Sequence, residues 1–131
     1  MSPEEIVYQA LANDSAIALI VGNRISSRHV ILGQELPCIT FQMIGGHMHY
    51  TQDGLDAMQS PVVQIDCWAR ISSYDVLTAL RIAVIDCLNG ADSPGVGRYF
   101  LITDDGTDFV EEKGTIGRKK IDAIVWHNRN A

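Results

Sequence analysis

Cysteine is scarce in this sequence of 131 residues, and the three that occur, Cys38, Cys67 and Cys87, lie far apart. None has a second cysteine at the spacing of a C-x-x-C motif, so that kind of metal or redox site is excluded. An odd number of separated cysteines predicts reduced thiols, as in a cytosolic compartment. No patterned histidine and acid accompany them, so we expect no cysteine nucleophile.

Long apolar runs are also lacking. The longest, at residues 16–21 and 82–85, fall far short of the roughly 20 apolar residues that a membrane-spanning helix needs. The sequence begins MSPEEIVYQ, with acids and no basic segment, so no secretory signal is expected. These observations predict a protein that does not associate with membranes.

Positive charge is in short supply, with 10 lysines and arginines against 16 aspartates and glutamates and a formal net charge of −6. Proteins that grip nucleic acid normally need a basic surface, so we expect no sequence-specific nucleic-acid binding. A protein of this charge can still let DNA pass without holding it. A hydrophobic content of 47% with 20% charged residues is typical of a folded chain, and the length predicts a single domain over residues 1–131.

The most regular stretch, residues 60–90, predicts a strand, a capped turn and the longest helix of the chain. Ser72 is placed to cap this helix, with Asp75 in the capping-box position. Asn89 and Gly90 predict its end. The alternation of the strand predicts an inner face of Val63, Ile65, Cys67, Ala69 and Ile71, and an outer face of Gln64, Asp66, Trp68 and Arg70. The apolar stripe of the helix is expected to comprise Leu77, Leu80, Val84, Cys87 and Leu88.

The other segments predict two short helices and several strands. The helices are expected to run from Pro3 towards Asn13 and over 15–21. Strands are expected at 24–30, 38–44, 98–103 and 116–127, the last with Ile121, Ala123 and Val125 facing inward. A break is expected at 45–46, an exposed loop at 51–60, and an Asp-Gly turn at 104–107 with the next residues pairing back as a hairpin arm. This order predicts an α+β domain, with a mostly antiparallel sheet of about four to five strands and helices packed on one face.

Several segments, taken in order, carry a resemblance to a known family. The clearest is VQIDCWA at residues 63–69, followed by Ser-Tyr and a long helix. The others are ALIVGNRI at 18–25, LPCITFQ at 36–42 and IVWH at 124–127. Together they resemble the tail-completion, or tail-to-head joining, proteins of phages and prophages. Residues 45–60 and the acidic turn after Thr103 match no pattern of that family.

The resemblance implies a structural, non-enzymatic protein of the virion that needs no cofactor. It implies a homo-oligomeric ring at the head-proximal end of the tail, with a hexamer as one candidate because related tail-terminator proteins form hexameric rings around a DNA channel. The implied partners are other copies of the chain, the tail-tube protein and a head-completion or connector protein, with assembly in the host bacterial cytoplasm. An alternative within the same setting is a connector or neck component on the head side.

Some residues are candidates for contact with another subunit or partner. Trp68 is a large apolar residue on the strand face that should not meet the chain's own long helix, so either the two early helices or another subunit must cover it. Ile82 lies opposite the apolar stripe of the helix and could form a contact patch with Ile85. The candidate interface residues are Met48, Tyr50, Asp66, Trp68, Arg70, Ile82 and Ile85.

An acidic run follows the predicted strand at 98–103. Carboxylates bunched on a turn are usually solvated, but in a ring the same segment could face the lumen and repel the DNA backbone. The basic segment at 118–120 is close enough in sequence to neutralise it, within one chain or across an interface. The residues of this possible lumen-facing loop are Asp104, Asp105, Asp108, Glu111 and Glu112.

A different class of function rests on His47 and His49, which would share a face of an extended strand. Two ligands do not make a metal site, and no third ligand is identifiable by spacing. A small metal-binding domain or enzyme using these histidines and the acidic run is therefore the competing hypothesis, and it predicts metal in the purified protein. The favoured prediction has no metal site and no catalytic residue.

Overall fold

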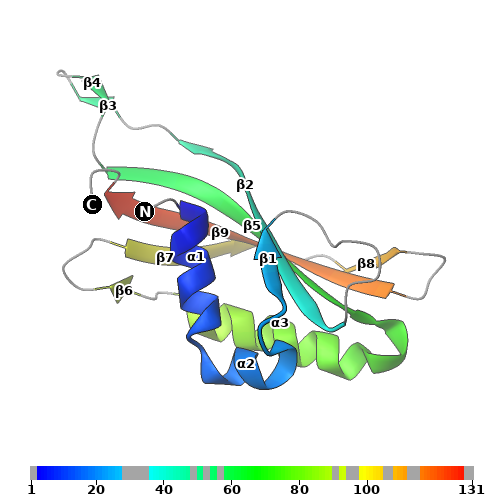
Figure 1. Ribbon diagram of the computed structural model, residues 1–131. Coiled ribbons are helices and arrows are strands. Elements are labelled where there is room, and N and C mark those ends of the chain that lie inside the picture. Colours follow the sequence, from blue (N-terminus) through cyan, green and yellow to red (C-terminus); the bar gives the residue numbers. More distant parts are fainter. Residues whose placement is uncertain are drawn as a thin grey trace.

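The computed structural model of the chain describes residues 3–27, 36–47, 50–51, 54–55, 58–89, 92–93, 98–104, 108–111 and 116–128. Most of the described strands form one sheet in the order β1-β2-β5-β9-β7-β6, with β8 pairing with β9 next to β7 (Figure 1). Apart from the parallel pair β1 and β2, neighbouring strands are antiparallel. The strands are β1 (Ile25–Ser27), β2 (Cys38–His47), β5 (Met58–Arg70), β6 (Asp92–Ser93), β7 (Arg98–Asp104), β8 (Asp108–Glu111) and β9 (Ile116–Asn128).

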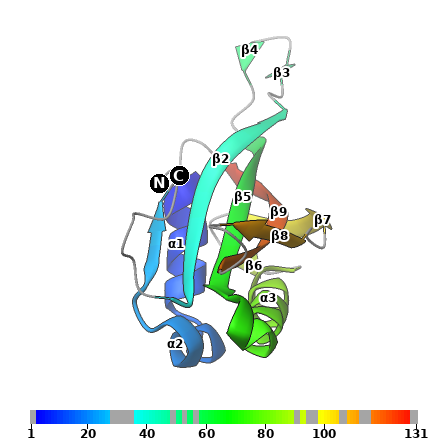
Figure 2. The same ribbon diagram turned by 90° about the vertical axis from the view of Figure 1, so that its right-hand side faces the viewer.

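The helices pack together on one face of this sheet. They are α1 (Pro3–Ala12), α2 (Ser15–Val21) and α3 (Tyr74–Leu88). Helix α3 packs against β5, β9 and β7, whereas α1 packs against β1, β2 and β5 and also touches α3 (Figure 2). This arrangement confirms the predicted α+β fold with a mostly antiparallel sheet. Four long lines of strand, formed by β2, β5, β9 and the pair β7 and β8, agree with the predicted number.

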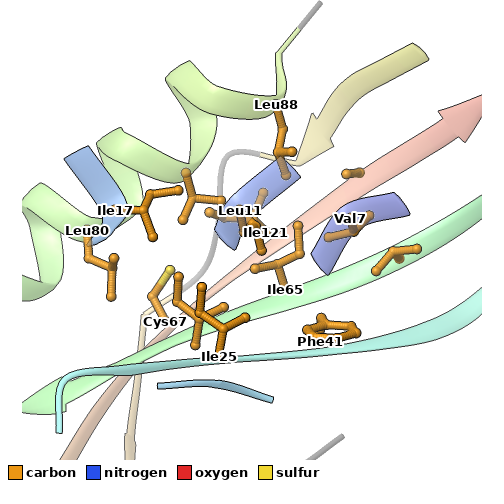
Figure 3. Close-up of a cluster of buried hydrophobic side chains, with 14 of the residues drawn as sticks. Val7, Leu11, Ile17, Ile25, Phe41, Ile65, Cys67, Leu80, Leu88 and Ile121 are labelled. Atoms are coloured by element: carbon orange, nitrogen blue, oxygen red, sulfur yellow. The ribbon is translucent and has the colours of Figure 1, made fainter. Parts of the chain in front are cut away.

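The core lies between the helices and the inner face of the sheet. Alternation along β5 buries Val63, Ile65 and Cys67 completely, and the predicted stripe of α3 meets them from the other side. In the close-up, Leu80 and Leu88 of α3 and Ile17 of α2 converge on Ile65, Cys67 and Ile121 (Figure 3). The inner positions predicted for β9, Ile121, Ala123 and Val125, are all fully buried.

The starts of α2 and α3 differ in how they are capped. Helix α2 begins after Asp14, whose Oδ1 accepts a hydrogen bond from the Ile17 backbone N–H at 3.0 Å. The predicted Ser72 cap of α3 is wrong, because a turn of 3₁₀ helix, η1 (Ile71–Ser73), comes first and moves the N-cap to Ser73. Neither the new cap nor η1 uses a side-chain cap hydrogen bond, and Ile71 leaves the strand.

The expected break at Gly45 is also wrong. Strand β2 continues to His47, and the register against β5 shifts between Met43 and Gly45, which marks a bulge. Gly45 has a φ of 148°, which residues with a Cβ rarely adopt, so glycine keeps the strand going here rather than ending it. The predicted loop at 51–60 is likewise shorter, because β3 (Tyr50–Thr51) pairs with β4 (Gly54–Leu55) and β5 starts at Met58.

The segment after Asp104 is not the predicted hairpin. Strands β7 and β8 both pair antiparallel with β9, so they run in the same direction and form one interrupted line. Asp104 lies opposite Asp122 and Asp108 lies opposite Lys119. Between these two pairs the chain advances by four residues on the β7–β8 side and by three residues on β9. The strands on either side of the Asp-Gly signal therefore pair with β9 and not with each other.

Candidate functional site

The outer face of the sheet, opposite the helices, carries a polar ladder across β2, β5 and β9. The strand register puts Cys38, Trp68 and Arg118 in one row. Thr40, Asp66 and Lys120 form the next row, followed by Gln42, Gln64 and Asp122. Since directly opposed residues of a pair share a face, Gln64, Asp66 and Trp68 of the predicted outer face of β5 lie in this ladder, between residues of β2 and β9 that are distant in the sequence.

Trp68 is held by its neighbours in the ladder. Its indole Nε1 donates a hydrogen bond to Thr40 Oγ1 at 2.9 Å, and the Arg118 guanidinium lies over its ring, 5.3 Å from the centroid. The side chain is 9% exposed within the single chain. An indole whose N–H is satisfied and whose face meets a guanidinium is stable without a partner protein. The predicted role of Trp68 in an interface stays a prediction, but its burial does not require one.

Asp66 is the buried carboxylate of the ladder, with 4% of its surface exposed. Gln64 Nε2 donates to both carboxylate oxygens, at 3.2 and 3.0 Å, and Arg118 Nη1 lies 3.8 Å from Oδ2. Beside it, Lys120 Nζ is 3.5 Å from Asp122 Oδ2. Burial raises the pKa of Asp66 above its ordinary value, and the bonds from Gln64 and the charge of Arg118 only partly oppose this.

The raised pKa of Asp66 predicts how stability should change with pH. A carboxyl with a higher pKa in the folded state contributes stability below its unfolded pKa, and this contribution is lost as the pH rises through the folded value. Starting from the ordinary value of 3.8, the free energy of unfolding of the wild-type chain should therefore fall with pH relative to Asp66→Asn, which cannot ionise. Urea denaturation at several pH values measures this difference, and a difference that rises with pH would contradict the expectation.

The remaining candidate interface residues are placed separately. Arg70 is exposed, and Ile82 is 50% exposed on the outer side of α3. Ile85, the expected partner of Ile82 in a contact patch, is half-buried and packs against the core, and the patch itself stays a prediction. Met48 and the side chain of Tyr50 lie outside the described residues. Four further apolar residues are exposed although no sequence pattern singles them out: Tyr8, Leu19, Met43 and Ile44, at 42%, 88%, 51% and 46%.

The acidic run lies along the sheet edge formed by β7 and β8. The backbones of Asp104, Asp108 and Glu111 pair with β9, whereas Asp105 and Glu112 lie outside the described residues. Charge along an edge strand discourages unwanted pairing with other sheets. The register sets Asp108 opposite Lys119, and neutralisation of the run by the basic segment stays a prediction. A position facing a lumen stays a prediction.

The cysteines are poor nucleophiles in the folded chain. Burial raises the pKa of Cys38 to about 11 and that of Cys87 to about 12, and it raises the pKa of Cys67 as well. Cys87 is also tied to α1, because its Sγ donates to the Ala10 carbonyl oxygen at 3.4 Å. The thiolate, which is the reactive form, is therefore rare at neutral pH.

The state of these thiols can be tested directly with a chromogenic disulfide reagent at pH 8. We expect the native chain to react roughly a hundredfold or more slowly than the chain in urea, because burial hides the thiols and suppresses the thiolate. The progress curve should release three equivalents only after unfolding, one for each of Cys38, Cys67 and Cys87. A fast native phase of one equivalent would show that a thiol is activated and accessible.

In the described part of the chain, no three His, Cys, Asp or Glu residues come together as a potential metal site. The side chain of His47 and all of His49 lie outside the described part, so the structure does not test the histidine hypothesis. None of the described helices has the length and apolar character to cross a bilayer.

Comparisons with known proteins support the resemblance noted in the sequence. A family model described as Tail completion protein gp17 matches residues 5–123. Eight chains of solved structures match significantly. One, from a structure titled "Virion of native gene transfer agent (GTA) particle", aligns with a TM-score of 0.73 and 20% identity, over 92% of this chain and 90% of that chain. At this identity the likeness shows a shared fold. No curated protein sequence matches significantly.

Proposed function

The chain belongs to the tail completion protein gp17 family, and from this premise we propose that it completes the tail tube of a phage or prophage and joins the tail to the head. We propose further that it acts as a homo-oligomeric ring without enzymatic activity. The family match over residues 5–123 carries the proposal. The gene transfer agent chain with the same fold comes from an assembled virion particle, a setting consistent with a structural component.

A structural role agrees with the chemistry of the described residues. The charged groups that could attract a catalytic interpretation, the buried Asp66 and the half-buried Arg118, contact neighbours within one sheet face. Catalysis needs groups that are free to exchange protons with a substrate or attack it. The ladder instead fixes three strands relative to one another, as a rigid assembly unit requires.

The proposed partners are the tail-tube protein on one side of the ring and a head-completion or connector protein on the other. The proposed location is the head-proximal end of the tail in the virion, after assembly in the host bacterial cytoplasm. The net charge of −6 favours a ring that lets DNA pass without binding it. A lumen-facing acidic run is one arrangement that such a ring allows.

Deleting the gene from its phage or prophage tests the proposed joining role. We expect induced lysates to contain filled heads and separate tails, with joined particles restored when the wild-type gene is supplied in trans. A plasmid carrying the same gene with an early stop codon is the matched control. Joined, infectious particles in the deletion strain would contradict the role.

Purified components locate the protein on the particle. The wild-type chain mixed with isolated tail tubes should give one stain-excluding ring at one tube end in negative-stain images. Binding to tailless heads but not to tubes would favour the head-side connector instead. Metal analysis of the same preparation, made without chelator, tests the histidine hypothesis, which requires bound metal that is lost in the His47→Ala, His49→Ala double variant.

A further inference from the structure

The strands at the two edges of the main sheet are only partly covered by a further strand. At one end, β1 pairs with β2 only at Ile39, Thr40 and Phe41, and no other described strand pairs with residues 42–47 on that side. At the other end, β6 pairs with β7 only at Arg98 and Tyr99. Within the described residues, 100–104 and 108–111 therefore have no further strand beyond them. We call these the β2 edge and the β7–β8 edge.

The β2 edge is apolar and exposed. Met43 and Ile44 are 51% and 46% exposed. Tyr8 of α1 is 42% exposed, and its ring lies 6.1 Å from that of Phe41 on β2. Phe41 and Met43 share one face of β2 because they are two residues apart. An unpaired strand with adjacent exposed apolar residues is a template for another strand and a liability if left open. We therefore expect the β2 edge to pair with another strand in the assembled protein.

The directions of the strands indicate which strand can pair with the β2 edge. Strands β2, β5, β9 and the β7–β8 line alternate in direction, so the two edges run oppositely. When copies of such a sheet are placed end to end by rotation, the β2 edge of one copy meets the β7–β8 edge of the next in antiparallel orientation. A contact between two different patches of the same chain is heterologous and closes into a ring when the rotation closes.

Charge points to the same pairing. The β7–β8 edge carries Asp104, Asp108 and Glu111, so pairing this edge with its own copy would set carboxylates against carboxylates. Like charges directly opposite each other destabilise a strand pair. Residues 42–47 of the β2 edge contain no carboxylate. Charge therefore favours the β2 edge over a second copy of the β7–β8 edge as the partner of the acidic edge.

We propose that the subunits of the ring are joined by sheet extension, with the β2 edge of one copy paired to the β7–β8 edge of the next. Tyr8, Met43 and Ile44 form the apolar centre of this seam. The proposal rests on the ring of the proposed function and names its interface. It places the acidic line at the seam between copies, which is an alternative to a position in the lumen.

Photo-crosslinking from Ile44 tests the seam. The full-length chain with p-benzoylphenylalanine at position 44 is mixed with isotope-labelled wild-type chain, irradiated with and without tail tubes, and mapped by mass spectrometry. We expect crosslinks between a light and a heavy chain that end in residues 98–111. The same probe at Leu19, which is 88% exposed on α2 and far from both edges, is the matched control and should give none.

Each other result overturns the seam. Light-to-heavy crosslinks from position 44 to residues 42–47 indicate two-fold pairing of β2 edges, and crosslinks to tail-tube protein alone make this edge the tube-binding surface. Absence of any crosslink between copies, or crosslinks between copies from Leu19 only, also contradicts it. Ring formation on tubes is scored separately in negative-stain images, so failure of the seam and failure of the proposed function are distinguishable.

A pair of charge variants provides a second test. Ile44→Asp sets a carboxylate against the acidic edge, and like-charge juxtaposition should weaken association roughly tenfold or more. Ile44→Lys introduces the same desolvation problem with the opposite charge and should weaken association several-fold less. Circular dichroism checks that both variants fold. Equal loss in the two variants, or no loss in either, would count against the acidic edge as the occupant.

Discussion

Replacing Leu80 by alanine should lower the free energy of unfolding by about 2–5 kcal/mol, because the substitution leaves a cavity as well as removing buried apolar surface. Leu80 is fully buried at the centre of the α3 stripe, facing Cys67 and Ile65 across the core. At roughly 3–5 °C per kcal/mol for a domain of this size, the melting temperature should fall by about 6–25 °C. Urea denaturation at a protein concentration too low for assembly measures the effect.

Ile82→Ala on the same helix is the matched control. Ile82 is 50% exposed, and substitutions at such surface positions usually change stability by no more than about 0.5 kcal/mol. Both variants lose side-chain carbons and gain some helix propensity, slightly more at Ile82 because isoleucine is β-branched. That difference is far smaller than the expected effect of burial. If the two variants were equally stable, the packing of α3 on the sheet would be wrong.

The parts of the fold predicted correctly are those in which periodicity alone determines which side is buried. The two-residue period of β5 and β9 and the helical stripe of α3 identified the core, including Ile65, Leu80 and Ile121. Local chemistry was enough for α2, which lies between Asp14 and Gly22 as expected. These patterns are short-range and need no knowledge of which strands become neighbours.

The wrong predictions concern segments whose structure depends on which strand they pair with. An Asp-Gly turn signal is the same whether the flanking segments pair with each other or, as Asp104 and Asp108 do, with a third strand. The glycines at 45–46 can end a strand or form a bulge, and pairing with β5 favours the bulge. The exposed residues Met43 and Ile44 were missed for the same reason, because their exposure depends on how short β1 is.

Trp68 shows how far the candidate site could be predicted from the sequence. Alternation correctly placed it on the outer face of β5, but its burial comes from Thr40, 28 residues earlier, and from Arg118, on a strand that follows much later. No local pattern contains these distances. The sequence therefore left two explanations for an outward tryptophan, cover by the chain itself or cover by another subunit.

Trp68→Ala distinguishes them. If the ladder buries Trp68 within one chain, the substitution should cost about 3–5 kcal/mol of unfolding free energy, as for other buried aromatic residues. Trp68→Phe keeps an aromatic face for Arg118 but loses the bond to Thr40, so it should cost about 1–3 kcal/mol, mostly for the hydroxyl left without its donor. Arg70→Ala, two residues along the same face and exposed, is the control and should stay close to wild type. These values are measured on dilute, unassembled chain.

An interface tryptophan would give the opposite pattern, with Trp68→Ala as stable as wild type when dilute and defective only in assembly. The hydrogen bond to Thr40 and the guanidinium contact with Arg118 lie inside one chain and favour the first result.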